Sequence, residues 1–132
     1  MILYRPVGLH ELRLIADSGY RAFPPRLPEQ PIFYPVLVLE YARQIARDWN
    51  TTSSSFAGFV TWFEVDDAFT VKYPVQVVGA REHQELWVPA HELDDFNRHI
   101  VGRIQVIESY AGDGFDGQLD PGTHLPVGWS RE

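Results

Sequence analysis

The stretch Phe56–Val65 restricts the folds open to this chain more than any other part of the sequence. It is dense in aromatic and β-branched residues, and bulky side chains stand at both odd and even positions, as at Phe59, Val60 and Trp62. Residues of these types favour a strand. An apolar run without alternation indicates a strand that is buried on both faces. We therefore expect a central strand around which the other elements are arranged.

A first strand and two helices are predicted before this central strand, besides a short strand between the helices. The strand covers Met1–Arg5 and ends at Pro6. The first helix follows Gly8 and ends at Ser18-Gly19, because glycine tolerates the left-handed conformation beyond a last turn. Its apolar face comprises Leu9, Leu12, Ile15 and Ala16. The second helix covers Leu37–Trp49, and the residues on one of its faces are Val38, Ala42, Ile45 and Trp49.

The segment between these two helices is rich in proline. Five prolines within Tyr20–Pro35 exclude a helix, and only Ile32–Tyr34 has the composition of a short strand. We interpret the rest as a rigid surface loop, which can wall a pocket at small entropic cost. Pro24–Pro28 also fits a polyproline ligand for an aromatic groove on a partner protein.

The C-terminal half combines short strands with an amphipathic helix. Asp66-Asp67 begins a turn or short helix, and Pro89–Ile100 has a helical apolar face; the expected strands are Tyr73–Val78, Glu85–Val88 and Ile104–Tyr110. Residues 111–132 contain five of the ten glycines and no periodicity, so we expect a Gly-rich extended tail after a single domain over residues 1–110. Mixed elements with short connections favour an α+β fold with a mainly antiparallel sheet and about three helices.

Charge and composition argue against several classes of function. The chain has 11 basic and 18 acidic residues, a formal net charge of −7 and no basic run, so general nucleic-acid binding is not expected. It has no cysteine, which excludes disulfides, thiol nucleophiles and thiolate metal sites. No apolar stretch approaches the roughly 20 residues that span a bilayer, and the N-terminus does not resemble a signal peptide. We therefore expect a cytoplasmic protein with no membrane partner.

The common catalytic motifs are also missing. The five histidines lack metal-ligand spacing, so no metal is expected. There is no glycine-rich phosphate loop and no Gly-x-Ser-x-Gly elbow. What remains is a set of residues at predicted strand ends, where sites are commonly built: Arg5, Tyr34 and Glu85. A carboxylate held on rigid strand backbone, as Glu85 is expected to be, suits catalysis.

The order of these three residues around a helix resembles the ADP-ribosyltransferase-like superfamily. Leu3-Tyr4-Arg5 is similar to the first-strand motif of that superfamily, and Phe33-Tyr34 to the strand that flanks nicotinamide. Glu85-Leu86-Trp87-Val88-Pro89 is similar to the catalytic strand. His83 stands two residues before Glu85, where arginine-modifying members have Glu or Gln, so the acceptor of ADP-ribose stays open.

A closer resemblance is to a short bacterial family labelled ADP-ribosylation/crystallin J1. It is based on three stretches and covers about residues 1–110: Tyr4-Arg5-Pro6-Val7-Gly8, Gly19-Tyr20-Arg21-Ala22-Phe23-Pro24-Pro25-Arg26 and Glu85-Leu86-Trp87-Val88-Pro89. True ADP-ribosyl hydrolases of the crystallin J1 type are longer and all-helical, and they depend on Asp-bound magnesium. This chain is strand-rich and lacks such Asp clusters. The transferase-like interpretation therefore fits the residues better.

The resemblance implies an NAD-consuming enzyme, either a mono-ADP-ribosyltransferase or an NAD glycohydrolase. Glu85 would stabilise an oxocarbenium-like transition state, and His83 would orient the acceptor or water. NAD would be held by Tyr4, Arg5 and Tyr34, and its pyrophosphate would lie near Arg21 and Arg26. The acceptor would be a protein, a nucleic acid, a small molecule or water.

The same residues leave a non-catalytic alternative. An acidic surface and a Pro-rich loop also fit a protein- or nucleotide-binding module on this fold, such as an immunity or regulatory protein that binds a protein partner without turnover.

Overall fold

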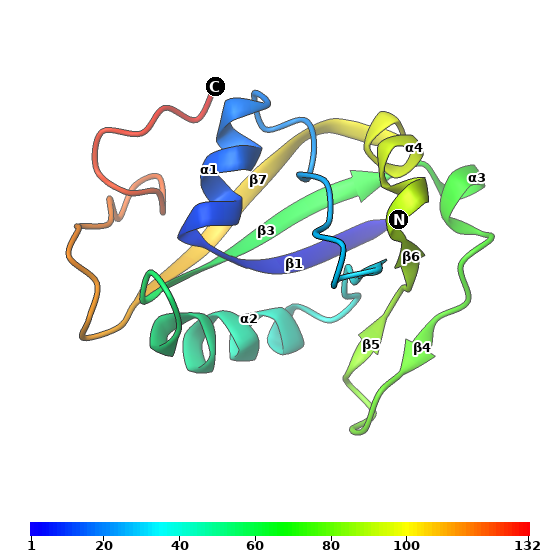
Figure 1. Ribbon diagram of the computed structural model, residues 1–132, viewed down its shortest axis with the longest axis horizontal. Helices are drawn as coiled ribbons and strands as arrows, with labels where there is room; N and C mark the ends of the chain where they lie inside the picture. Colours follow the sequence, from blue (N-terminus) through cyan, green and yellow to red (C-terminus); the bar gives the residue numbers. More distant parts are fainter.

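The main sheet consists of three antiparallel strands. In the computed structural model, which describes residues 1–132, they are β1 (Ile2–Gly8), β3 (Ala57–Val65) and β7 (Ile100–Ala111), with β3 in the middle (Figure 1). β3 pairs with β1 along one edge and with β7 along the other. Seven of its nine residues are buried, which confirms the expectation of a central strand and of a mainly antiparallel α+β fold.

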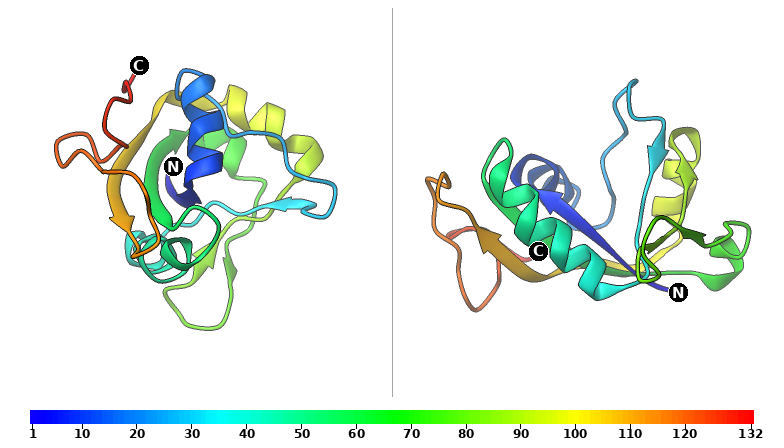
Figure 2. Two further views of the ribbon diagram at one scale, coloured as in Figure 1. Left: turned by 60° about the vertical axis from the view of Figure 1, so that its left-hand side comes forward. Right: turned by 90° about the horizontal axis from the view of Figure 1, so that it is seen from below.

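The two longest helices cover opposite faces of this sheet. α1 (Leu9–Asp17) packs over the larger hydrophobic core and α2 (Leu39–Asp48) over a smaller one, as Figures 1 and 2 show from three directions. Successive side chains of a strand point to opposite faces. Accordingly, Phe59 of β3 belongs to the core under α1 and Val60 to the core under α2. None of the helices has the length and apolar character needed to cross a membrane.

α2 is shorter than the predicted helix Leu37–Trp49. Leu37 stays extended because its backbone N–H donates to the carbonyl of Gln84, 2.9 Å away. Trp49 follows the last helical residue and is 71% exposed, so its predicted place on the buried face is wrong. Beyond it the chain forms a single 3₁₀ turn, η1 (Asn50–Thr52), in the polar stretch before β3.

A second antiparallel pairing links the middle of the chain with the stretch around Glu85. β2 (Ile32–Phe33) pairs with β6 (Val88–Pro89), and an isolated bridge joins Val36 to Glu85 in the same register. The two short strands predicted around Tyr34 and Glu85 are therefore partners in one ladder that is interrupted in its middle.

Val36 joins this ladder to the main sheet. Its N–H and C=O both bond to Tyr4 of β1, each at 2.8 Å. On the opposite edge of the Val36 segment lies β5 (Gln84–Glu85), which in turn pairs with β4 (Gln76–Val77). We refer to the hairpin of β4 and β5 as the arm. Figure 1 shows the arm extending away from the three long strands.

The helices after β3 differ from the prediction in length and number. α3 (Asp67–Thr70) is the short helix expected there, capped by Asp66. Pro89 still belongs to β6, so the predicted helix Pro89–Ile100 is replaced by a 3₁₀ turn, η2 (Ala90–Glu92), and by α4 (Leu93–Arg98). The protein therefore has four α-helices instead of about three.

Two of the three strands predicted after β3 also have other bounds. β4 comprises two residues instead of Tyr73–Val78, because Tyr73 turns inward to donate its hydroxyl to Glu92 at 2.6 Å. β7 begins at Ile100 instead of Ile104, since its first residues already pair with β3.

The C-terminal segment 112–132 packs against the domain. Leu125 is only 1% exposed and belongs to the larger core. The Tyr20 hydroxyl donates to the Ser130 carbonyl at 2.6 Å, and the Arg13 guanidinium lies over the Trp129 ring. Three further hydrophobic residues of this segment are partly buried against the core: Phe115, Leu119 and Trp129.

An ion pair between α2 and β7 makes stability depend on pH. Arg43 donates to both carboxylate oxygens of Glu108, at 2.8 and 2.6 Å. These bonds, with one from Tyr110, hold the pKa of Glu108 below its ordinary value of 4.5. Because the folded-state pKa is the lower one, the pair stabilises the fold above about pH 4.5, and this contribution is lost as the pH falls through the depressed pKa. The wild type should therefore lose more stability than Glu108→Gln between about pH 5 and 3 in urea titrations. Equal losses would contradict this role of Glu108.

Candidate functional site

An open pocket of about 490 Å³ lies where β1 separates from the Val36 segment. The edge of β1 that faces away from β3 is paired at only one residue, Tyr4. The backbone of Pro6, two residues later, faces the same edge. Because proline has no N–H, this unpaired position leaves no backbone donor without a partner. Arg5 and Pro6 border the opening, and the opposite walls come from α2, the arm and the segments beside it: Tyr34, Tyr41, Val78, Glu85 and Trp87.

Glu85 supplies the buried carboxylate of this pocket. The residue is 8% exposed, and both of its oxygens accept a hydrogen bond. The Tyr41 hydroxyl donates to Oε2 at 3.2 Å, and the Trp87 indole N–H donates to Oε1 at 2.8 Å. None of the ion pairs of the protein includes Glu85. Two neutral donors therefore fix the carboxylate without neutralising its charge.

Tyr41 is held as a donor by this arrangement. Its burial, followed by the negative charge of Glu85 and the hydrogen bond to it, raises the pKa of the Tyr41 phenol above its ordinary value of 10. The phenol therefore stays protonated throughout the neutral pH range and can donate to the carboxylate.

Two exposed aromatic side chains stand beside the carboxylate. Tyr34 is 40% exposed and Trp87 45% exposed, and both line the pocket. Strand alternation explains their common direction, because Tyr34 is two residues from Val36 and Trp87 two residues from Glu85. The pocket thus offers aromatic surface for a planar ring next to an unneutralised negative charge.

His83 lies behind Tyr41. The two rings are stacked, with centroids 4.3 Å apart and planes inclined by 15°. The His83 carbonyl also accepts the N–H of Val78 across the arm. His83 is thus placed to support the ring that holds Glu85, whereas the sequence suggests a direct contact with acceptor or water.

Arg5 borders the pocket, but its guanidinium turns to the opposite face of the sheet. It donates from Nε and one terminal nitrogen to both oxygens of Glu11 on α1, at 2.6 and 3.0 Å. The pair is well shielded, with 11% and 23% of the two side chains exposed. The carboxylate of Glu11 therefore occupies the two guanidinium nitrogens of Arg5 that would otherwise hold a phosphate. One further nitrogen approaches the carbonyl of Tyr34 at 3.4 Å, so Arg5 also fixes the backbone at Tyr34, directly after β2.

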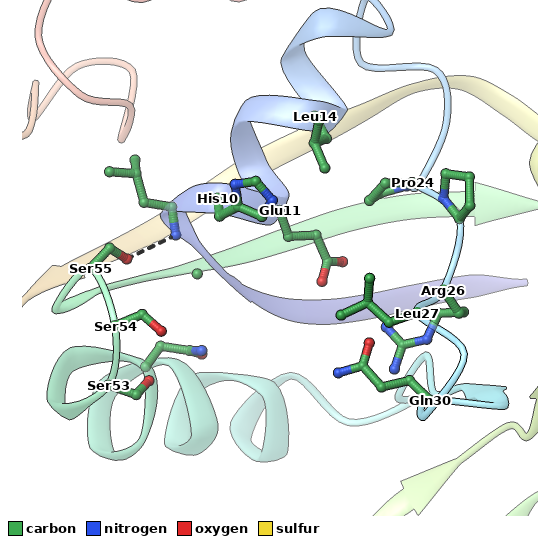
Figure 3. A pocket seen from close by; sticks show the side chains of 14 residues that line it. His10, Glu11, Leu14, Pro24, Arg26, Leu27, Gln30, Ser53, Ser54 and Ser55 are labelled. Carbon is green, nitrogen blue, oxygen red and sulfur yellow. Dashed lines mark hydrogen bonds between the residues drawn. The ribbon is translucent and has the colours of Figure 1, made fainter.

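A second cavity, of about 420 Å³, lies on this opposite face. α1, the Pro-rich loop and the serine-rich connector after α2 surround it, and Figure 3 shows Glu11 and Arg26 entering it from different sides. The Pro-rich loop therefore forms a wall of this cavity, as expected.

Arg26 donates to the Ile32 carbonyl at 3.1 Å. Burial and the nearby charge of Arg5 lower the pKa of its guanidinium. The Oδ1 atom of Asn50 is buried without a hydrogen-bond partner.

The two remaining predicted residues lie apart from both cavities. Tyr4 packs against the small core under α2. Arg21 is exposed, and its backbone N–H bonds to the Ser18 hydroxyl. Of the seven predicted residues, Tyr34, Glu85 and Arg5 line the first pocket, Arg26 lines the second, and His83 lies one residue layer behind the first.

Sequence reasoning missed the two residues that hold Glu85. Trp87 stands two positions after Glu85, and alternation along a strand already places both on one face. Tyr41 gives a weaker signal. It follows Leu37 by four residues on the predicted helix, but no local pattern indicates which residue its hydroxyl meets.

Comparisons with known proteins give no assignment. No protein-family model, no curated protein and no solved structure matches the chain. The fold also assembles no group of three or more His, Asp or Glu side chains that could hold a metal ion.

Proposed function

We propose that the protein cleaves the nicotinamide–ribose bond of NAD and transfers ADP-ribose to an acceptor or to water, as ADP-ribosyltransferase-like enzymes do. One observation carries this proposal: Glu85 is a buried, unneutralised carboxylate held by two donors beside exposed aromatic rings. Arg5, Tyr34 and Glu85, which carry the resemblance to that superfamily, all border the same pocket.

The chemistry follows from the charge that develops on the ribose. The C–N bond to nicotinamide breaks with its electron pair leaving on nicotinamide, so the ribose acquires oxocarbenium character. A carboxylate fixed beforehand stabilises this charge more in the transition state than in the ground state. An acceptor nucleophile or water then forms the new bond to the ribose carbon, and its proton passes to solvent.

The pocket suits the nicotinamide half of the molecule. The pyridinium ring is planar and cationic, and it would stack on Tyr34 or Trp87. Glu85 would lie at the edge of the ring, near the bond that breaks. Nicotinamide leaves as a neutral molecule, so the attraction to the carboxylate and the aromatic faces falls after cleavage.

The ADP half would extend past the Arg5–Glu11 pair toward the second cavity. Arg26 would then approach the pyrophosphate, since its two terminal nitrogens make no hydrogen bond within the protein. In this arrangement Arg5 acts as a positioning residue for the opening, because its fork is engaged by Glu11.

The direct test is incubation of the purified protein with NAD, with nicotinamide release followed by chromatography and NAD binding by calorimetry. Release supports the proposal and leaves the acceptor to be identified. Binding without release supports occupancy of the pocket and requires a search for the acceptor. Absence of both results would overturn the proposal.

A second candidate function is recognition of a cationic ligand without turnover. It is favoured by the lack of any basic partner for Glu85 and by the exposed aromatic side chains around it, which together suit an organic cation. Tight binding of N-methylnicotinamide with no cleavage of NAD would favour this candidate over the enzyme.

Tyr41→Phe tests the support of the carboxylate. The change removes the hydroxyl that donates to Oε2 of Glu85 and keeps the ring that stacks on His83. We expect nicotinamide release to fall about tenfold, which corresponds to the loss of one charge-assisted hydrogen bond. The matched control is Tyr110→Phe, whose hydroxyl donates to Glu108 on the same strand, β7, outside this pocket. An equal fall in both variants would argue against a specific role for Tyr41.

A further inference from the structure

A third cavity lies between the edge of β7 and the C-terminal segment, away from both pockets described above. Its volume is about 230 Å³, and its floor is formed by buried apolar side chains. Ile104 is 2% exposed and Leu125 1% exposed. Polar side chains stand around this floor: Arg103, Gln105, Thr123 and Arg131.

The two arginines at this cavity have no carboxylate partner. Five of the 11 basic side chains of the protein form ion pairs with acids, and neither Arg103 nor Arg131 is among them. Neither lies over an aromatic ring, as Arg13 does over Trp129. They are 28 positions apart in the sequence, and the fold brings both to one cavity in a protein with net charge −7.

The backbone around the cavity is fixed before any ligand arrives. The Ile104 N–H donates to the Tyr20 carbonyl at 2.7 Å, and the Tyr20 hydroxyl donates to the carbonyl of Ser130, next to Arg131. The Thr123 hydroxyl oxygen accepts the Leu125 N–H at 3.2 Å, so its own proton remains available to a ligand. Donors therefore converge on a site whose walls are anchored to the core.

We propose that this cavity binds a small organic oxyanion, a carboxylate or a phosphate monoester with a compact apolar body. Two guanidinium groups match the paired oxygens of such an anion. The apolar floor accommodates the body, and Gln105 and Thr123 supply neutral hydrogen bonds. The ligand bridges β7 and the C-terminal segment, so its binding stabilises the folded protein. This site is independent of the proposed NAD chemistry.

The test measures thermal unfolding and binding heat with three probes at constant ionic strength: benzoate, phenyl phosphate and inorganic phosphate. We expect at least one organic probe to raise Tm by about 2 °C or more at saturation. A preference for benzoate or for phenyl phosphate identifies the acidic group, and a weaker effect of inorganic phosphate identifies the contribution of the apolar body. Arg103→Gln and Arg131→Gln should each weaken binding about tenfold or more.

Arg81→Gln is the matched control, since Arg81 also lacks an ion pair and lies at the tip of the arm, outside this cavity. It should keep the full response. Both arginines of the cavity are exposed, so their replacement should leave the fold intact. The proposal is overturned if no probe acts beyond sodium chloride at the same ionic strength, or if Arg81→Gln loses the response to the same extent.

Discussion

Replacing Glu85 with glutamine should lower nicotinamide release from NAD by about 100-fold or more. Glutamine has nearly the shape of glutamate, but it carries no charge to stabilise an oxocarbenium-like transition state. Its amide oxygen can accept only one of the two hydrogen bonds that Tyr41 and Trp87 now make. Single-turnover assays with the enzyme in excess over NAD give the effect on the chemical step, because product release does not contribute to the observed rate.

The control for this experiment is Glu82→Gln. Glu82 lies three residues earlier and is exposed at the tip of the arm, so its replacement removes the same charge outside the pocket. Thermal unfolding of both variants should remain cooperative. Unchanged nicotinamide release in a folded Glu85→Gln variant would remove Glu85 from the mechanism and leave the pocket as a binding site only.

Gly58→Ala should destabilise the protein by about 3 kcal/mol or more, which lowers Tm by about 10 °C. Gly58 lies on β3 where α2 approaches the sheet. A Cβ there would overlap the backbone carbonyl of Ala46 and come within 2.8 Å of the Asn50 Cβ. Ala46 lies in the last turn of α2 and Asn50 in η1 directly after it, so the helix end would have to move off the sheet and leave the small core under it exposed.

Gly8→Ala provides a close comparison, because Gly8 is the residue paired with Gly58 across β1 and β3. A Cβ at Gly8 would meet its nearest atoms at 3.9 Å, an ordinary contact. Chemical denaturation of both variants measures the difference. Similar stability of the two would mean that α2 shifts at little cost and that the packing of α2 on β3 contributes less than its geometry indicates.

The elements that the sequence predicts well are those with strong periodicity. The central strand was predictable because Phe59, Val60 and Trp62 leave neither face polar. α1 was predictable because its apolar residues recur at helical spacing and a glycine follows its end. The short strands near Tyr34 and Glu85 could be located from their composition, but their pairing could not be predicted, because it depends on contacts between residues about 50 positions apart. The order of Leu125 depends in the same way on a core that forms elsewhere.

The candidate site was predictable only in part. Glu85 and Tyr34 could be selected because they stand at the ends of apolar runs. Which face each side chain takes depends on the register through Val36, and that register cannot be read from composition. Arg5 illustrates the limit. Its position on the first strand is as expected, but its engagement by Glu11 depends on the direction of α1 after Gly8.

The connection of the main sheet to the arm through the single residue Val36 affects how the pocket beside Glu85 can open. Two backbone hydrogen bonds to Tyr4 are the only β-ladder link between the three long strands and the segment that carries the arm. Each contributes about 1 kcal/mol net, so the wall with Glu85 is held mainly by the burial of Phe33, Leu86 and Val88 in the larger core. Movement of the whole wall would expose these side chains to water. The pocket therefore widens at lowest cost at the arm, where Val77 and Val78 are exposed.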